Sequence, residues 1–135
     1  MKISNKHIAE IADLLDAGQI CYFHKQTGQI EHHTDPDSPF FDPDKWKDII
    51  SYIKKDSNNF MRFELMDSRD SYKVMANFAH SIQDTTISEK LVDTLAQPKP
   101  FQNFKHQIQY LNYLDDWYKF KQSAMMDWVR QQIAE

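Results

Sequence analysis

The sequence has little glycine, a single cysteine and no long apolar run. Loops that cradle phosphate need several glycines close together, because the backbone must approach the anion. With only Gly18 and Gly28, the chain has no dinucleotide fingerprint, no P-loop and no nucleophile elbow. We therefore expect no cofactor.

The lone cysteine, Cys21, cannot form an internal disulfide and leaves no Cys-x-x-Cys zinc or redox motif. Such cysteine usage is typical of a reducing compartment, so we expect a cytoplasmic protein. The N-terminus lacks the apolar core of a signal peptide, and no stretch approaches the roughly 18 apolar residues of a membrane span. We expect no membrane partner.

The chain of 135 residues has the length and composition of one globular domain, residues 1–135. Apolar residues make up 41% and aromatic residues 13% of it, so large rings must form much of the core. The net charge of −4 is too negative for a protein whose main task is to neutralise a nucleic acid backbone.

The first half alternates helical and extended patterns. Apolar residues at helical spacing predict a helix over 5–17 and another, of about three turns, that begins at Pro43. Two β-prone runs, 19–25 and 29–34, flank a turn that contains glycine and predict a hairpin. Alternating apolar residues predict a third strand over 60–66.

Capping residues mark where the helices begin. Ser4 or Asn5 suits the first helix, and Asp42 suits the second. In the second half, Ser68 is expected to cap a helix, and Thr86 opens a capping box with the glutamate three residues later. Two further helical patterns follow the prolines near residue 100.

These elements predict an α+β fold. A small three-stranded antiparallel sheet, made of a hairpin and one further strand, is covered by about six helices. Residues 1–66 supply a helix, the hairpin, a helix and the strand. The helix-rich C-terminal half, residues 67–135, is expected to pack on the sheet.

Several landmarks carry a family resemblance. They are Arg62-Phe63-Glu64, the run from Ser68 to Phe78, Phe101-Gln102-Asn103-Phe104-Lys105, Asp116-Trp117-Tyr118-Lys119-Phe120 and Trp128. In order and spacing they resemble bacterial uncharacterised protein family 0158, and residues 22–30 resemble its strand, Thr-Gly turn and strand. The resemblance covers nearly the whole chain and implies the fold and a bacterial cytoplasmic setting. It supplies no reaction, because the family has no established activity.

The segment 97–106 departs from the family's pattern. Gln102 and Asn103 stand where the family tends to have arginines, which leaves Lys99 and Lys105 as the basic residues here. An anion-binding helix would need that charge, so the departure weighs against such a role.

Three histidines, His24, His32 and His33, lie on the predicted hairpin, and Asp35 follows them. If residue 24 pairs with residue 31, one of the adjacent histidines comes near His24. A metal site needs three or four ligands in fixed geometry, whereas adjacent strand residues point to opposite faces. We therefore expect solvated histidines and assign no metal ligand.

Two other groups of residues invite a chemical interpretation. Cys21 lacks a recognised nucleophile signature, and we expect a buried small side chain on a strand. Glu64, Asp67 and Asp70 recur every three residues and would suit acid–base chemistry or a hard cation. They also straddle a helix start, where the helix dipole favours acidic groups, and we prefer the capping interpretation.

The second half is rich in rings, namely Phe101, Phe104, Trp117, Tyr118, Phe120 and Trp128. With lysines interleaved, they suggest a stacking platform for single-stranded nucleic acid. From Lys99 to Glu135, however, five basic residues stand against four acidic ones, far from a basic groove. We expect the rings to be mainly core, and any exposed ring to meet another protein.

Two classes of function follow. The lack of a catalytic signature favours a non-enzymatic cytoplasmic protein-interaction or adaptor domain, with a protein partner or a second copy of the chain. The alternative is a small-ligand-binding protein or small enzyme, with a site between the sheet and the helical half. Its candidate ligand-binding residues are Tyr22, Arg62, Glu64, Tyr72 and Lys105. Weak nucleic-acid binding ranks third, after these two classes.

Overall fold

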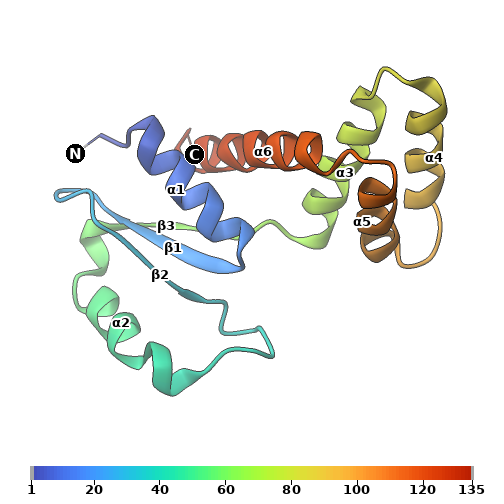
Figure 1. Ribbon diagram of the computed structural model, residues 1–135. Helices are drawn as coiled ribbons and strands as arrows, with labels where there is room; N and C mark the ends of the chain where they lie inside the picture. Colours follow the sequence, from blue (N-terminus) through green and yellow to red (C-terminus); the bar gives the residue numbers. More distant parts are fainter. Residues whose placement is uncertain (1, 135) are drawn as a thin grey trace. The chain divides into compact units, whose positions relative to one another are not determined.

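The computed structural model describes residues 2–134. Over that range the chain forms six α-helices and one three-stranded antiparallel sheet (Figure 1), so the predicted α+β class is confirmed. The chain divides into two compact units, the first made of Met1–Leu65 with Met125–Glu135 and the second of Met66–Ala124. Each unit has its own hydrophobic core.

The first unit holds the sheet, whose strands lie in the order β2-β1-β3. The central strand β1, Gln19–His24, pairs antiparallel with β2, Ile30–Thr34, and with β3, Phe60–Phe63. Every residue of β1 after Gln19 is buried, because helices lie over both faces of the sheet (Figure 1).

Helix α1, Asn5–Asp16, lies over one face of the sheet. It begins with a capping box, in which Ser4 accepts from the His7 backbone N–H and the His7 ring accepts from the Ser4 N–H. The His7 ring then packs edge-on against Phe23 of β1, with centroids 5.0 Å apart. The cap therefore also joins the helix to the sheet.

Helix α2, Pro43–Lys55, lies over the opposite face, and Asp42 caps it as predicted. Its buried Ile53 packs against Ile20 of β1. A short 3-10 turn, η1 over Ser57–Asn59, leads from α2 into β3.

Strand β3 ends three residues before the predicted span 60–66 does. Beyond it, the backbone of Glu64 is bound by side chains from the end of α6, Leu114–Ala134. Its N–H donates to Gln132 over 2.7 Å, and its carbonyl accepts from the Trp128 indole over 2.8 Å. These side chains take the place of a further strand partner.

The second unit is helical. It contains α3 over Ser68–Ser81, α4 over Thr85–Leu95, α5 over Pro100–Tyr110 and the first part of α6. Its core is built around Phe78, whose ring centroid lies 5.3 Å from Trp117 and 6.4 Å from Phe104. No helix within residues 2–134 is both long enough and apolar enough to cross a membrane.

Two predicted helix caps in this unit are wrong. The N-cap of α3 is Asp67, which accepts from the Asp70 N–H, and not Ser68. The N-cap of α4 is Asp84, which accepts from the Ile87 N–H, and not Thr86. In each case an aspartate lies one or two residues before the predicted cap, and its carboxylate is the stronger acceptor for the free amides of a helix start.

The ring set of the second half is only partly core. Phe104 and Trp117 are buried, and Phe120 packs against them. Phe101 is 40% exposed in the first turn of α5, and Tyr118 is also exposed, which corrects the expectation for these two rings.

Candidate functional site

The hairpin does not have the register considered for a metal site, in which residue 24 would stand opposite residue 31. The His24 N–H donates to the carbonyl of Gln29, and Tyr22 stands opposite Glu31. The turn is tighter than that register allows, because the Gly28 N–H donates back to the His24 carbonyl. Gly28 has φ 77°, a left-handed conformation that glycine adopts without strain.

The same register separates the two adjacent histidines. His33 stands opposite Ile20, and His32 stands opposite Cys21, so their side chains leave opposite faces of the sheet. Within the part of the chain that the structure describes, no group of three or more His, Cys, Asp or Glu side chains suits a metal ion.

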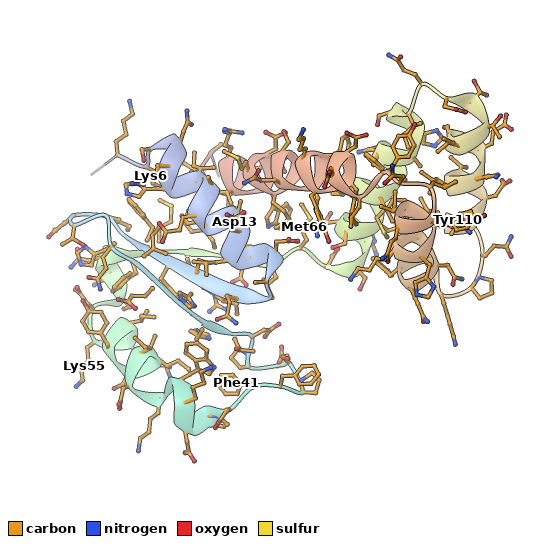
Figure 2. The ribbon with its side chains drawn as sticks, in the orientation of Figure 1. Lys6, Asp13, Phe41, Lys55, Met66 and Tyr110 are labelled. Carbon is orange, nitrogen blue, oxygen red and sulfur yellow. The ribbon has the colours of Figure 1, made fainter. Side chains whose placement is uncertain are left out.

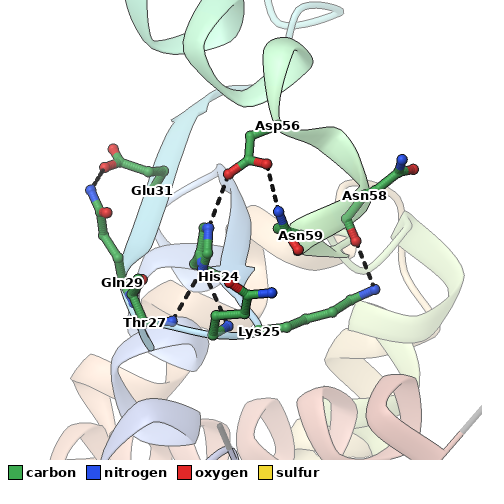
Figure 3. Close-up of polar contacts among 9 residues, drawn as sticks. His24, Lys25, Thr27, Gln29, Glu31, Asp56, Asn58 and Asn59 are labelled. Atoms are coloured by element: carbon green, nitrogen blue, oxygen red, sulfur yellow. Dashed lines mark hydrogen bonds and ion pairs between the residues drawn. The ribbon is translucent and has the colours of Figure 1, made fainter.

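His24 is the centre of a polar cluster at the closed end of the hairpin (Figure 3). Its Nδ1 accepts from the backbone N–H groups of Gln26 and Thr27, at 3.2 and 3.1 Å. The proton must therefore be on Nε2, which donates to Asp56 over 3.0 Å. The other Asp56 oxygen accepts from the Asn59 amide over 2.6 Å. This cluster ties the hairpin turn to the segment between α2 and β3.

The pair formed by His24 and Asp56 resembles the histidine and carboxylate of a catalytic site, but its chemistry differs. A general base needs a ring nitrogen free to take a proton from a substrate. Both nitrogens of His24 are engaged within the chain, and the side chain is buried. The cluster is therefore a structural clasp, and we call His24, Asp56 and Asn59 the hairpin clasp.

We expect the hairpin clasp to make stability depend on pH. The hydrogen bonds from Asn59 and then His24 hold the pKa of Asp56 below its ordinary value. A depressed carboxyl pKa stabilises the fold above the unfolded value of about 4, and this contribution is lost as pH falls through the folded value. In urea unfolding from about pH 7 to pH 2, Asp56→Asn should flatten the acid decline.

A matched variant, Asp48→Asn, removes an exposed carboxylate from α2, the helix that ends just before Asp56. It should leave the acid decline as steep as in the unchanged protein. Because Asp56 is partly solvent-exposed, added salt should shrink the difference. An Asp56→Asn profile that parallels the unchanged protein would refute the assignment.

His33 is buried and its ring is also fully engaged. Its Nδ1 lies 2.8 Å from the Thr34 carbonyl, which can only accept, so Nδ1 carries the proton. Its Nε2 therefore accepts from the Tyr22 hydroxyl over 2.9 Å. His32 donates from Nδ1 to the Gln19 side-chain oxygen over 3.0 Å. The hairpin histidines thus make internal hydrogen bonds, and two of them are buried instead of solvated as expected.

The structure brings together three of the five candidate ligand-binding residues. The Arg62 guanidinium carbon lies 5.8 Å from the Tyr22 ring centroid, and Arg62 Nε lies 2.6 Å from a Glu64 carboxylate oxygen. Arg62 and Glu64 are exposed, as alternation along the strand predicts for Arg62. Burial raises the pKa of Tyr22, and the positive charge of Arg62 opposes part of that rise. Glu64 neutralises the arginine, which lowers its value as an anion site.

The other two candidates belong to the second unit. The Tyr72 hydroxyl donates to the Leu95 carbonyl over 3.0 Å and so joins α3 to α4. Lys105 is exposed on α5. The proposed ligand site between the sheet and the helical half stays a prediction.

Cys21 is buried, as expected, and has the environment of an unreactive thiol. Burial, with a smaller effect from the Glu10 charge, raises the pKa of Cys21 to about 12. The acidic residues near α3 act as predicted where Asp67 caps the helix, whereas Glu64 pairs with Arg62.

Sequence reasoning missed several residues with clear roles. Asp56 and Asn59 lie between the predicted second helix and the predicted third strand, where no role was assigned, and nothing in the sequence pattern indicated a role for Gln132. Phe40, in the loop between β2 and α2, is 87% exposed although its neighbour Phe41 is partly buried. The turn-rich loop could have indicated exposure, but not which ring.

Comparison with known proteins supports the family resemblance. The model of an uncharacterised protein family, UPF0158, matches residues 2–134. A protein of Pseudomonas aeruginosa that bears the same family name is 23% identical over 83 residues, which are 61% of this chain and 54% of that protein. The match therefore spans about half the length of that relative. No solved structure matches. With the family match covering nearly its entire length, this chain belongs to the uncharacterised protein family UPF0158.

Proposed function

We propose that this chain is a non-enzymatic protein-interaction domain that works in the cytoplasm. The polar side chains best suited to catalysis or ligand binding make their contacts within the chain. His24 and His33 use both ring nitrogens, and Arg62 is paired with Glu64. A free but buried cysteine accords with a reducing compartment.

The observation that carries the proposal is the exposure of large rings. Phe40 is 87% exposed in the first unit, and Tyr110 is 83% exposed at the end of α5 in the second (Figure 2 labels Tyr110). Aromatic side chains are enriched where proteins bind one another, because a ring supplies a large contact area with few rotatable bonds. Catalysis offers no comparable reason to place these rings in water.

The test is site-specific photo-cross-linking in living cells. The full chain would carry p-benzoylphenylalanine at Phe40, at Tyr110 or, as a control, at the exposed Lys54. We expect a discrete adduct with another protein from at least one ring position and none from Lys54. The identified protein should then bind the purified chain, and alanine at the cross-linking position should weaken that binding.

Two outcomes would contradict the proposal. Absence of an adduct at both ring positions, from chains that melt at the unchanged temperature, would contradict it. So would a partner whose affinity is unaffected by both Phe40→Ala and Tyr110→Ala.

A further inference from the structure

We propose that the loop around Phe40 is a preformed docking element for a protein with an apolar pocket rimmed by lysine or arginine. This inference rests on the proposed function and names the class of partner for one of its two ring positions. It depends on three features of the loop, which are the exposed ring, the hydrogen-bonded backbone and the acidic residues near the ring in the sequence.

The backbone that presents Phe40 is held by a series of short-range hydrogen bonds. Asp35 accepts from the Asp37 N–H through its side chain, at 2.9 Å, and from the Ser38 N–H through its carbonyl, also at 2.9 Å. Ser38 accepts from the Phe40 N–H through its hydroxyl and from the Phe41 N–H through its carbonyl, at 3.2 and 3.1 Å. The ring is therefore carried by a chain of successive turns.

Proline and the neighbouring ring restrict the loop further. Pro36 and Pro39 fix their own φ angles, and Pro43 begins α2 directly after the cap. Phe41, labelled in Figure 2, is partly buried, whereas Phe40 is almost fully exposed. A backbone that is already held by hydrogen bonds loses little conformational freedom when a partner covers the ring that it carries.

The charged residues nearest to Phe40 in the sequence are acidic, and the nearest lysine or arginine is Lys45. Between Gln26 and Asp44 the sequence contains no lysine and no arginine. The same stretch contains five carboxylates, those of Glu31, Asp35, Asp37, Asp42 and Asp44. A partner pocket that accepts the ring would bring its rim against these carboxylates, so basic rim residues would attract and acidic ones would repel.

The exposed Phe40 ring favours a partner with a pocket over a partner with a flat surface. Phe40 is an almost fully exposed ring, whereas the adjacent Phe41 is partly buried, and Asp37 and Asp42 lie within three residues of it in the sequence. Such a ring gains most when it is fully desolvated in a concave site, as anchor residues are at the centres of interfaces. The aspartates of this loop also argue against a second copy of the same loop as the partner, because like charges would face each other.

The experiment begins with the photo-cross-linker at Phe40 in the full chain, and maps the linked peptide in the partner by mass spectrometry. We expect apolar residues at the linkage and lysine or arginine close by. With the purified partner, Phe40→Ala should weaken binding about thirtyfold or more. Tyr110→Ala, which removes a similarly exposed ring from the other unit, should leave this affinity unchanged.

Charge reversal tests the rim separately. Asp37→Lys should slow association about tenfold at low salt and reduce its dependence on salt, because long-range attraction chiefly governs the rate of encounter. Asp93→Lys makes the same change of charge at an exposed position of α4 and should have little effect on the association rate. Unchanged melting temperatures would show that all four variants fold.

Several outcomes would overturn this inference. An acidic rim at the linkage, an adduct formed only within the same chain, or equal effects of Asp37→Lys and Asp93→Lys would each do so. An adduct at Tyr110 with none at Phe40 overturns this inference and leaves the proposed function standing, whereas adducts at neither position overturn both.

Discussion

Replacing Phe104 with alanine is expected to destabilise the second unit by about 3–5 kcal/mol, because the change leaves a cavity in a closely packed ring cluster. Phe104 is 0% exposed, and its ring centroid lies 5.1 Å from that of Trp117 and 6.4 Å from that of Phe78. A loss of this size is a large part of the total stability of a small domain. The melting temperature should fall by about 15 °C or more.

The same helix supplies the control for this experiment. Phe101→Ala removes an identical side chain three positions earlier, where the ring is 40% exposed, and should cost about 1 kcal/mol or less. Unfolding in urea would be followed by tryptophan fluorescence, to which Trp117 of the affected cluster contributes together with Trp46 and Trp128. Similar losses for Phe101→Ala and Phe104→Ala would contradict the packing described for this core.

The thiol of Cys21 is expected to be almost inert while the protein is folded. Burial raises its pKa from 9.0 to about 12, which lowers the reactive thiolate at pH 8 about a thousandfold. The side chain is also 0% exposed, so a reagent cannot reach it without local opening. Labelling by a disulfide reagent should therefore be at least about a thousandfold slower in buffer than in denaturing urea.

An added surface thiol shows whether the reagent works under native conditions. Gln83→Cys places a cysteine at an exposed position between α3 and α4, and should react at the rate of a free thiol. The folded Gln83→Cys variant would then show one thiol that reacts fast and one, Cys21, that is protected. Fast reaction of Cys21 itself in the folded protein would overturn its assignment as an inert core residue and reopen a nucleophilic role.

The helix starts show how far local patterns reach. The prediction of helices that begin near Ser68 and Thr86 needed only nearby side chains and the 3.6-residue spacing, and the helices are there. The choice between neighbouring capping residues was wrong twice, because adjacent Asp, Ser and Thr side chains all suit a cap and differ only in final geometry. The Asp42 cap was predicted correctly, because Pro43 suits the first position of a helix and so makes the preceding residue the N-cap.

The hairpin shows where such patterns end. Its two strands follow from β-prone composition around a glycine, but a register shift of two residues keeps the same side chains on the same faces. Hydrophobic alternation therefore cannot choose between the two registers, and the turn closed by Gly28 does. That choice also decides which residues stand opposite the histidines and so which chemistry the hairpin can support.

The sequence by itself determined the types and order of the elements, the α+β class and the absence of glycine-rich and Cys-x-x-Cys motifs, because these depend on residue types and short spacings. Only the tertiary structure decided that His24 is a clasp, that Gln132 binds the backbone of Glu64, 68 residues away, and that Phe40 faces water while Phe41 does not. Such contacts depend on where the fold brings distant segments. Unlike a helix or a strand, a hydrogen bond between distant residues or the burial of one ring leaves no periodic pattern in the sequence.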